Sequence, residues 1–273
     1  MIAINRKAEG NGSSHVTMDR VPPLDEIGAV RRILGDAFPA DLRWTVDCLR
    51  ARGIAPSRTL LIAHGGPGIV PLVFAQELRV RTISVCRNER RADASRGRIG
   101  TQRGSDLVDL RIAQGVRLPA KDGAVDAVRC EATLPLESDP SVLLRELHRV
   151  TRAGGIGFFG ELIARPGWHL PAAIVEVMRT QKLDLQPMLA TEVEQLLVET
   201  GFSIQQVDAR AESTALIRSK VQRALGALKL ARRFIDPVRF GIDADQVQSG
   251  LLAIDGALED SDLMWTTWQT ERI

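Results

Sequence analysis

The feature that most constrains the fold is an alternation of short apolar runs with amphipathic segments, which begins at Thr59. An apolar run at 59–63 leads into the glycine-rich turn His64-Gly-Gly-Pro-Gly68, and apolar residues then recur over 69–78. This order predicts a buried strand, a tight turn and a helix. Further strands are predicted at 81–86, 107–113, 124–128 and 156–163, with helices at 88–100 and 141–150. Such alternation predicts the α/β class, with a Rossmann-like, mostly parallel sheet covered by helices on both faces.

The segments outside this alternation predict helical additions at both ends. Two short helices are expected within 25–52, and later helices at 171–182, 191–200 and 215–235, the last of them rich in Arg. A sixth strand is expected at 202–207 and an edge strand at 263–269. We therefore expect a flexible tail (1–23) and a single domain (24–273), made of a helical cap (24–56), a core (57–210), a helical insertion (211–255) and a last strand (256–273).

Composition excludes several classes of function. Lys and Arg total 36 against 34 Asp and Glu, a net charge of +2, so no global field favours nucleic acid. No apolar run approaches the roughly 18 residues of a transmembrane helix. The three cysteines form no Cys-x-x-Cys pair, so neither a zinc site nor a disulfide framework is indicated. The polar string Gly10-Asn-Gly-Ser-Ser14 lies where a signal peptide would be apolar, and a cytoplasmic protein is expected.

The glycine-rich turn has two interpretations. A glycine turn between a strand and a helix lets backbone amides approach a ligand. The string His64-Gly-Gly-Pro-Gly68 is also typical of the oxyanion loop of α/β-hydrolases, but those enzymes need a Gly-x-Ser-x-Gly nucleophile turn. No such pentad occurs in the chain. A ligand-binding turn is therefore favoured.

Three later strings favour one family. Leu118-Pro119 and Asp122 precede the fourth strand, and Asp126 lies near its start. Leu144-Arg-Glu146, Arg149-Val150 and Gly154-Gly155 precede the fifth strand, and Leu196-Leu-Val-Glu-Thr-Gly-Phe202 comes later. With these strings the segment 59–207 resembles the class I S-adenosylmethionine-dependent methyltransferases, in particular the small-molecule group that includes ubiquinone and menaquinone C-methyltransferases. The tail 263–272 resembles the last strand of that family. The resemblance implies a seven-stranded sheet, S-adenosyl-L-methionine as cofactor and a small-molecule substrate.

The cofactor positions implied by the resemblance depart from the family pattern. The acid that ends the first strand is replaced by Ile62, the first glycine of the turn by His64, and the ribose-binding acid of the second strand by Cys86. The adenine-binding acid aligns with Gln114, whose amide can still accept a hydrogen bond. The expected cofactor-binding residues are His64, Gly65, Gly66, Gly68, Cys86, Arg87, Gln114 and Gly115. Arg87, Asn88 or Glu89 could compensate for the missing carboxylate at position 86.

Two residues are candidates for catalysis. His169 follows the fifth strand, where the family builds its substrate pocket, and a base there could deprotonate the methyl acceptor. Glu131, just past the fourth strand, lies where the family places groups around the transferred methyl. The alternative for His169 is a structural or neutral role, and the alternative for Glu131 is a solvated loop acid. His64 is either a base, a donor to the cofactor carboxylate or a plain turn residue.

These patterns lead to one main hypothesis and two alternatives. The main hypothesis is methyl transfer to a small metabolite in the cytoplasm, without nucleic acid, a membrane span or a metal. The first alternative is a protein of the same fold that transfers no methyl group, such as a cyclase, an isomerase or a non-catalytic partner subunit. The second is a binder of anionic lipid surfaces through the Arg-rich helix. Trp265 and Trp268 either cover the core or form a homodimer contact.

Overall fold

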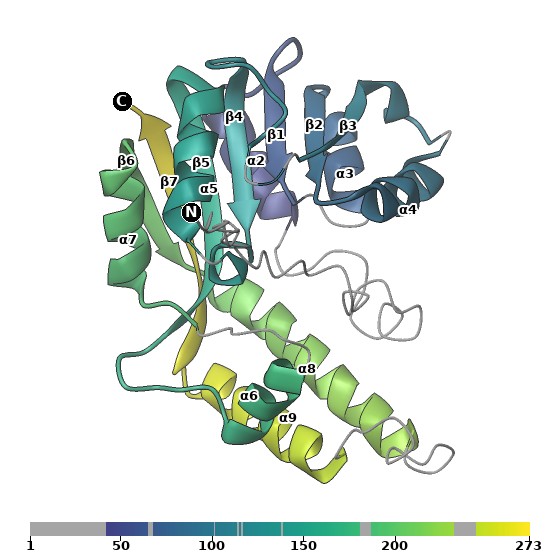
Figure 1. Cartoon of the computed structure of the whole chain (residues 1–273), viewed down its shortest axis with the longest axis vertical. Helices are drawn as coiled ribbons and strands as arrows, with labels where there is room; N and C mark the ends of the chain where they lie inside the picture. The colour runs from purple at the N-terminus through teal and green to yellow at the C-terminus, as the bar shows by residue number, and fades with distance from the viewer. Residues whose placement is uncertain are drawn as a thin grey trace, which may run out of the picture.

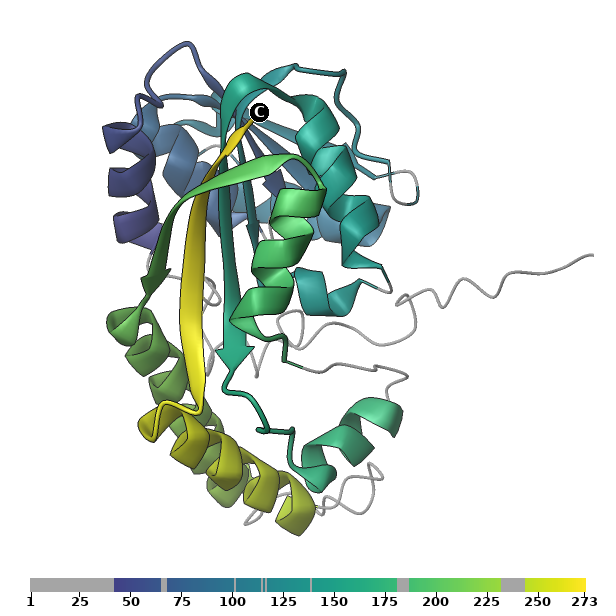
Figure 2. The same ribbon diagram turned by 90° about the vertical axis from the view of Figure 1, so that its left-hand side faces the viewer.

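The computed structural model describes residues 42–64, 68–100, 102–113, 115, 117–137, 139–180, 187–231 and 244–273. Within these residues the chain forms a seven-stranded sheet with helices on both faces (Figures 1 and 2), as the sequence predicted. The strands are β1 (Thr59–Ala63), β2 (Arg81–Cys86), β3 (Val108–Ile112), β4 (Val125–Glu131), β5 (Thr151–Ala164), β6 (Phe202–Ala209) and β7 (Leu263–Arg272). The helices are α2 (Leu42–Ala51), α3 (Ile69–Leu78), α4 (Glu89–Ile99), α5 (Pro140–Val150), α6 (Ala172–Thr180), α7 (Ala190–Glu199), α8 (Ala211–Ala231) and α9 (Ala244–Glu259), with short 3₁₀ turns η3 (Ser105–Leu107) and η4 (Leu134–Leu136).

The strands lie in the order β3-β2-β1-β4-β5-β7-β6. The pairs among β1 to β5 are parallel, and β7 runs antiparallel to both β5 and β6. The carboxyl ends of the parallel strands therefore lie together at one edge of the sheet, where α/β proteins bind their ligands.

The expectation that 263–269 forms an edge strand is wrong. Strand β7 pairs with a neighbour on each side, and Trp265 and Trp268 are 1% and 0% exposed. Because β7 inserts between β5 and β6, apolar side chains are buried on both of its faces. The outermost strand on this side of the sheet is β6. The two tryptophans cover the core and are not available as a dimer contact.

The sheet is covered by two apolar layers. One layer, packed by α5 and α7, includes Leu61, Val128, Phe159 and Leu144, and the other, packed by α2 and α3, includes Leu60, Ile62, Phe74 and Phe158. Ile62 is thus a core residue and not a ligand-facing one. The cap expected at 24–56 is described only from α2 onward, and the tail at 1–23 lies outside the described residues.

Helices α6, α8 and α9 form a helical layer beyond the carboxyl ends of the strands (Figure 1). Ile217 of α8, Leu258 of α9 and Trp265 of β7 share a third apolar cluster. Arg218 of α8 bonds Asp255 at 3.1 Å and Glu259 at 2.7 Å, so this member of the Arg-rich helix joins α8 to α9. Helix α9 continues to Glu259, past the boundary expected at 255. Among the residues described, no helix combines the length and the apolar character that crossing a membrane requires.

Candidate functional site

The two described residues of the turn that follows β1 both have left-handed backbone. His64 has φ 53° and Gly68 has φ 96°, both in the left-handed region. A Cβ on Gly68 would lie 2.9 Å from the backbone oxygen of Ser95, so only glycine fits between α3 and α4. Gly65 and Gly66 lie outside the described residues. The turn begins at the carboxyl edge of the sheet, where the sequence predicted it.

Three side chains form a polar network at this edge. The Nε2 of His64 lies 3.3 Å from Oε1 of Glu137, and the Nε of Arg87 donates to the Nδ1 of His64 at 3.2 Å. A guanidinium nitrogen of Arg87 also bonds the same Oε1. The network joins the ends of β1 and β2 to the segment after β4.

The hydrogen bonds of His64 fix its protonation. Because Nδ1 accepts a bond from Arg87, the ring proton of neutral His64 is on Nε2 and is donated to Glu137. Burial lowers the pKa of His64, and the charge of Arg87 adds to this, although Glu137 opposes it. Both ring nitrogens are therefore engaged, and His64 has no free lone pair with which to act as a base.

Glu137 is the partly exposed carboxylate of the site. Burial opposes its ionisation, but the His64 hydrogen bond and the Arg87 charge together lower its pKa. Its side chain is 23% exposed. Within the described part of the chain, the hydrogen bonds and ion pairs of this carboxylate are made by Oε1, and Oε2 makes no hydrogen bond or ion pair. Sequence reasoning missed Glu137, because it lies in a short loop with no periodicity.

Cys86 does not supply the missing ribose ligand. Its side chain is buried at the end of β2, and burial raises the pKa of the thiol, against the effect of a hydrogen bond with Ser95. Asn88 caps α4 by accepting the N–H of Arg91 at 3.0 Å. Glu89 bonds Arg96 at 2.8 Å on an exposed helix face, with its own side chain 62% exposed. Of the three expected substitutes, only Arg87 reaches the network.

Glu131 is not a solvated loop acid, as its structural alternative assumed. It is the last residue of β4, is buried, and accepts a 2.5 Å hydrogen bond on Oε2 from Arg129. Burial raises the pKa of Glu131, although Arg129 opposes this. Its Oε1 and the Nε of Arg129 have no partner in the described part of the structure. Arg129 also lies 5.3 Å from the centre of the Phe74 ring.

The remaining candidates are not brought into the network. His169 is exposed on the segment between β5 and α6, beside the half-buried Trp168, and none of the described residues of the network contacts it. Gly115 has φ 64°, and Gln114 lies outside the described residues.

A second buried acid, Glu161 of β5, lies near the same edge. Its Oε1 accepts the backbone N–H groups of Thr133 at 2.8 Å and Leu134 at 2.9 Å. Burial raises the pKa of Glu161 to about 8. The sequence carried a signal for it, because an acid within the apolar run 156–163 is unusual for a buried strand.

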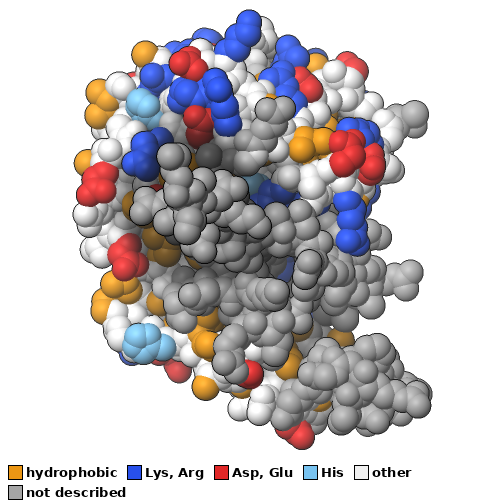
Figure 3. All heavy atoms as spheres, viewed as in Figure 1, with side chains coloured by type: hydrophobic (Ala, Val, Ile, Leu, Met, Phe, Trp, Pro, Cys, Tyr) orange, Lys and Arg blue, Asp and Glu red, His pale blue; other side chains and the backbone are white. Residues whose placement is uncertain are grey.

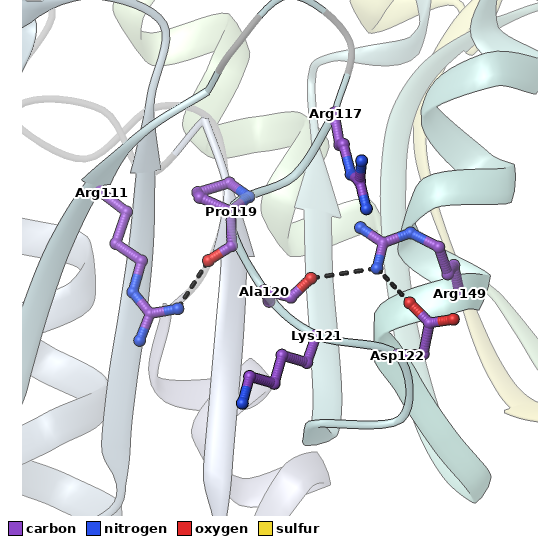
Figure 4. Close-up of a pocket in the computed structure, with 7 residues that line it drawn as sticks. All are labelled: Arg111, Arg117, Pro119, Ala120, Lys121, Asp122 and Arg149. Carbon is purple, nitrogen blue, oxygen red and sulfur yellow. Dashed lines mark hydrogen bonds and ion pairs between the residues drawn. The ribbon is translucent and has the colours of Figure 1, made fainter.

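A surface depression of about 540 Å³ is lined by Arg111, Arg117, Pro119, Ala120, Lys121, Asp122 and Arg149 (Figure 4), and none of the network residues His64, Arg87 and Glu137 lines it. All five N–H groups of Arg149 are occupied, by Glu146, Asp122 and the backbone oxygens of Leu118 and Ala120. Arg149 thus ties the loop before β4 to α5. Its role is structural.

Basic side chains gather at the opposite end of the sheet from the candidate site (upper end in Figure 3). There Arg58 and Arg152 each bond Asp126 at 2.8 Å, and Asp126 also accepts the N–H of Thr59 at 2.9 Å. The amino ends of β1, β4 and β5 are thereby joined. Asp126 therefore has a structural role, as expected for an acid near the start of a strand.

Comparison with known proteins supports the resemblance. Residues 63–159 match the family model described as methyltransferase domain. An uncharacterized 37.1 kDa protein in transposon TN4556 of Streptomyces fradiae is 25% identical over 247 residues, which cover 82% of this chain and 67% of that protein.

Two solved structures illustrate the shared fold. The [4+2]-cyclase SpnF is 18% identical, with a TM-score of 0.66 over 84% of this chain and 80% of its own. A geranyl diphosphate C-methyltransferase from Streptomyces coelicolor A3(2), solved with Mg²⁺, geranyl diphosphate and S-adenosyl-L-homocysteine, is 15% identical, with a TM-score of 0.62 over 85% of this chain and 80% of its own. At such identities these likenesses show the fold. The predicted fold is confirmed, and the narrower likeness to quinone C-methyltransferases stays a prediction.

Proposed function

This chain carries a class I S-adenosylmethionine-dependent methyltransferase domain, and on that premise we propose that it transfers a methyl group from S-adenosyl-L-methionine to a small-molecule metabolite. The described ends of the turn support this proposal, because His64 and Gly68 both have left-handed backbone where the chain passes from the carboxyl end of β1 to α3. The side chains around it differ from the family pattern. The polar contacts of the cofactor must therefore come from other groups.

Glu137 carries this proposal. It is an ionised carboxylate beside the turn, and its Oε1 is bound by His64 and Arg87. Among the described residues, none forms a hydrogen bond or ion pair with its Oε2. The buried Glu131 and Glu161 have raised pKa values and are less suited to this role. We assign to Oε2 the hydrogen bond with the cofactor that an acid at position 86 makes elsewhere in the family. Arg87, whose position follows Cys86 directly, orients that carboxylate.

The protein's part in the reaction is positional. The bound cofactor supplies an electrophilic methyl group on a sulfonium, which the acceptor attacks in line. The chain must hold the acceptor in that line and exclude water. The layer of α6, α8 and α9 lies where it can cover the edge of the sheet, with Trp168 and Trp265 in its apolar cluster.

His169 and Glu131 remain the candidates for proton removal. His169 is exposed and can meet a substrate, whereas Glu131 is buried and held by Arg129. We therefore assign the proton-accepting role to His169. Glu131, through its unengaged Oε1, would accept a hydrogen bond from the acceptor.

The cellular setting is also a proposal. The cysteines within the described residues, Cys48, Cys86 and Cys130, are free thiols, which suits the reducing cytoplasm. We propose a small-molecule enzyme with no nucleic-acid partner. A homodimer would need a surface other than β7, and light scattering would detect it.

Thermal unfolding with added ligand tests the main proposal. S-adenosyl-L-methionine or S-adenosyl-L-homocysteine at a hundred times its dissociation constant should stabilise the fold by about 2.7 kcal/mol. Adenosine triphosphate serves as a nucleoside control. Absence of any shift at millimolar cofactor would contradict the proposal.

A second candidate function is a non-methylating reaction on the same fold. The buried Cys86 and the core position of Ile62 favour it, and the similar structure SpnF is named a [4+2]-cyclase. Cofactor that binds tightly, while no methyl group reaches any of a panel of small-molecule acceptors, would support this candidate.

A further inference from the structure

Glu161 is a buried acid that the proposed reaction does not use. It lies in β5 and is 1% exposed, and its Oε1 accepts the N–H groups of both Thr133 and Leu134. A carboxyl group in a core costs more than an apolar side chain of the same size unless hydrogen bonds compensate. An apolar residue would fill this space at lower cost, so the two hydrogen bonds are the feature that distinguishes Glu161 from a core leucine.

The two amides belong to the second and third residues of the loop 132–137, and the last residue of this loop is Glu137 of the polar network. Leu134 is fully buried, and its carbonyl accepts the N–H of Glu137 at 3.1 Å. One 3₁₀ turn therefore separates the Glu161 anchor from the carboxylate that meets His64. The position of Leu134 sets the position of Glu137.

The start of the same loop is also held from β5. Ala132 has φ 48°, a strained value for a residue with a Cβ, and its N–H donates to the carbonyl of Gly160 at 2.8 Å. The hydroxyl of Thr133 donates to the carbonyl of Glu131 at 2.8 Å. The chain therefore leaves β4 along a path that its neighbours Gly160 and Glu161 determine.

We propose that Glu161 is a positioning residue, whose carboxyl group fixes the loop 132–137 so that Glu137 meets His64 and Arg87 at the cofactor edge. This inference rests on the proposed function only in assigning that network to cofactor binding. The geometry of the loop stands by itself.

The charged and titratable groups around Glu161 belong mainly to β4. Glu131 lies close enough to raise the pKa of Glu161, and Arg129 pairs with Glu131. Cys130 is fully buried, and burial together with Glu161 raises the pKa of its thiol. The carboxyl of Glu161 is thus favoured in its neutral form, in which its carbonyl oxygen still accepts both N–H groups.

Two substitutions separate positioning from packing. Glu161→Gln keeps an acceptor oxygen, whereas Glu161→Leu removes it. Phe158→Leu is the matched control, because Phe158 is buried in the same strand but faces the other apolar layer. Thermal unfolding measures the general loss of stability in each variant.

The decisive readouts are nuclear magnetic resonance signals of the loop amides and of His64, each compared with the same signals in Phe158→Leu, which measures the effect of a general loss of packing. In Glu161→Leu, we expect faster hydrogen exchange at the amides of Thr133 and Leu134, and a lower pKa of His64, because Glu137 no longer raises it. Phe158→Leu should leave the pKa of His64 unchanged and speed exchange at Thr133 and Leu134 no more than at other core amides. His64→Asn assigns the imidazole signal. An unaltered His64 titration in Glu161→Leu, despite a lower Tm, would overturn the proposal.

The wild type and Glu161→Gln decide the matter even if Glu161→Leu does not fold. The amide shifts of Thr133 and Leu134 should titrate near pH 8 in the wild type and stay flat in Glu161→Gln. A titration that persists in Glu161→Gln would overturn the assignment of these hydrogen bonds. Binding of S-adenosyl-L-homocysteine is measured in parallel, with a tenfold or larger rise in Kd expected for Glu161→Leu. If the wild type binds none, the proposed function fails, while the two spectroscopic readouts still judge the role of Glu161.

Discussion

Arg87 and Glu137 form an ion pair that links the carboxyl end of β2 to the loop after β4, directly beside His64. In the family pattern this neighbourhood holds an acid at the end of the second strand, where this chain has the buried Cys86. The carboxylate of Glu137 lies in this neighbourhood on a different loop, and its hydrogen bond with His64 and the charge of Arg87 together lower its pKa. Three predictions test whether this carboxylate takes the place of that acid, and a fourth concerns the stability of the fold.

Replacing Glu137 should weaken cofactor binding. In Glu137→Gln the charge-assisted hydrogen bond is lost, which is worth roughly 1.5 to 3 kcal/mol, or about one to two decades in Kd. Calorimetric titration with S-adenosyl-L-homocysteine measures the change. Glu89→Gln is the control, because Glu89 is an exposed acid on α4 that pairs with Arg96. Equal Kd values for both variants would show that the carboxylate is not relocated.

Replacing Arg87 should raise the pKa of His64. Arg87 opposes protonation of His64 in two ways, through its charge and through the hydrogen bond that occupies Nδ1. In Arg87→Leu both effects vanish, so the imidazole should titrate at higher pH than in the wild type when followed by nuclear magnetic resonance. Arg81→Gln, at the other end of β2 and paired with Asp109, should leave the titration unchanged. An unchanged or lower pKa of His64 in Arg87→Leu would mean that Arg87 does not oppose its protonation.

Restoring the family's acid at position 86 should damage the protein. Cys86 is only 3% exposed and interacts with Ser95, so an aspartate there would bury a charge without a prepared partner. We expect Cys86→Asp to cost on the order of 3 kcal/mol in the free energy of unfolding. Cys86→Ala is the control, and denaturant unfolding measures both. A Cys86→Asp variant that is as stable as Cys86→Ala and binds cofactor more tightly would show that position 86 does face the ligand.

The sequence predicted the scaffold well because periodicity and turn chemistry are local. The strands at 81–86 and 202–207 and the helix at 88–100 lie within a residue or two of β2, β6 and α4. The prediction of an edge strand at 263–269 was wrong because no local pattern shows that β7 inserts between β5 and β6.

The candidate site was less predictable, because its contacts join residues far apart in the chain. His64 and Arg87 were expected in the site from their place after two strands, but Glu137 enters it only through the path of the loop after β4. Glu131 was expected near the site. Its burial against Arg129 was not predicted, because burial depends on the whole sheet and on the helices packed against it.

The last prediction concerns the stability of the fold as a function of pH. The pKa of Glu161 is raised from its ordinary value of 4.5 to about 8, so the folded state binds more protons than the unfolded state between these two pH values. The contribution of Glu161 to stability is therefore fully present below about pH 4.5 and is lost as the pH rises toward 8, by at most about 1.4 kcal/mol per pH unit. A glutamine at position 161 has no carboxyl group to titrate.

The stability of the wild type relative to Glu161→Gln should thus fall across that interval, as measured by urea unfolding at several pH values. His64, whose lowered pKa makes stability rise with pH up to about 6.5, contributes equally to both proteins and cancels in the difference. A difference that does not vary with pH would show that Glu161 is ionised in the folded protein, held as a carboxylate by the amides of Thr133 and Leu134.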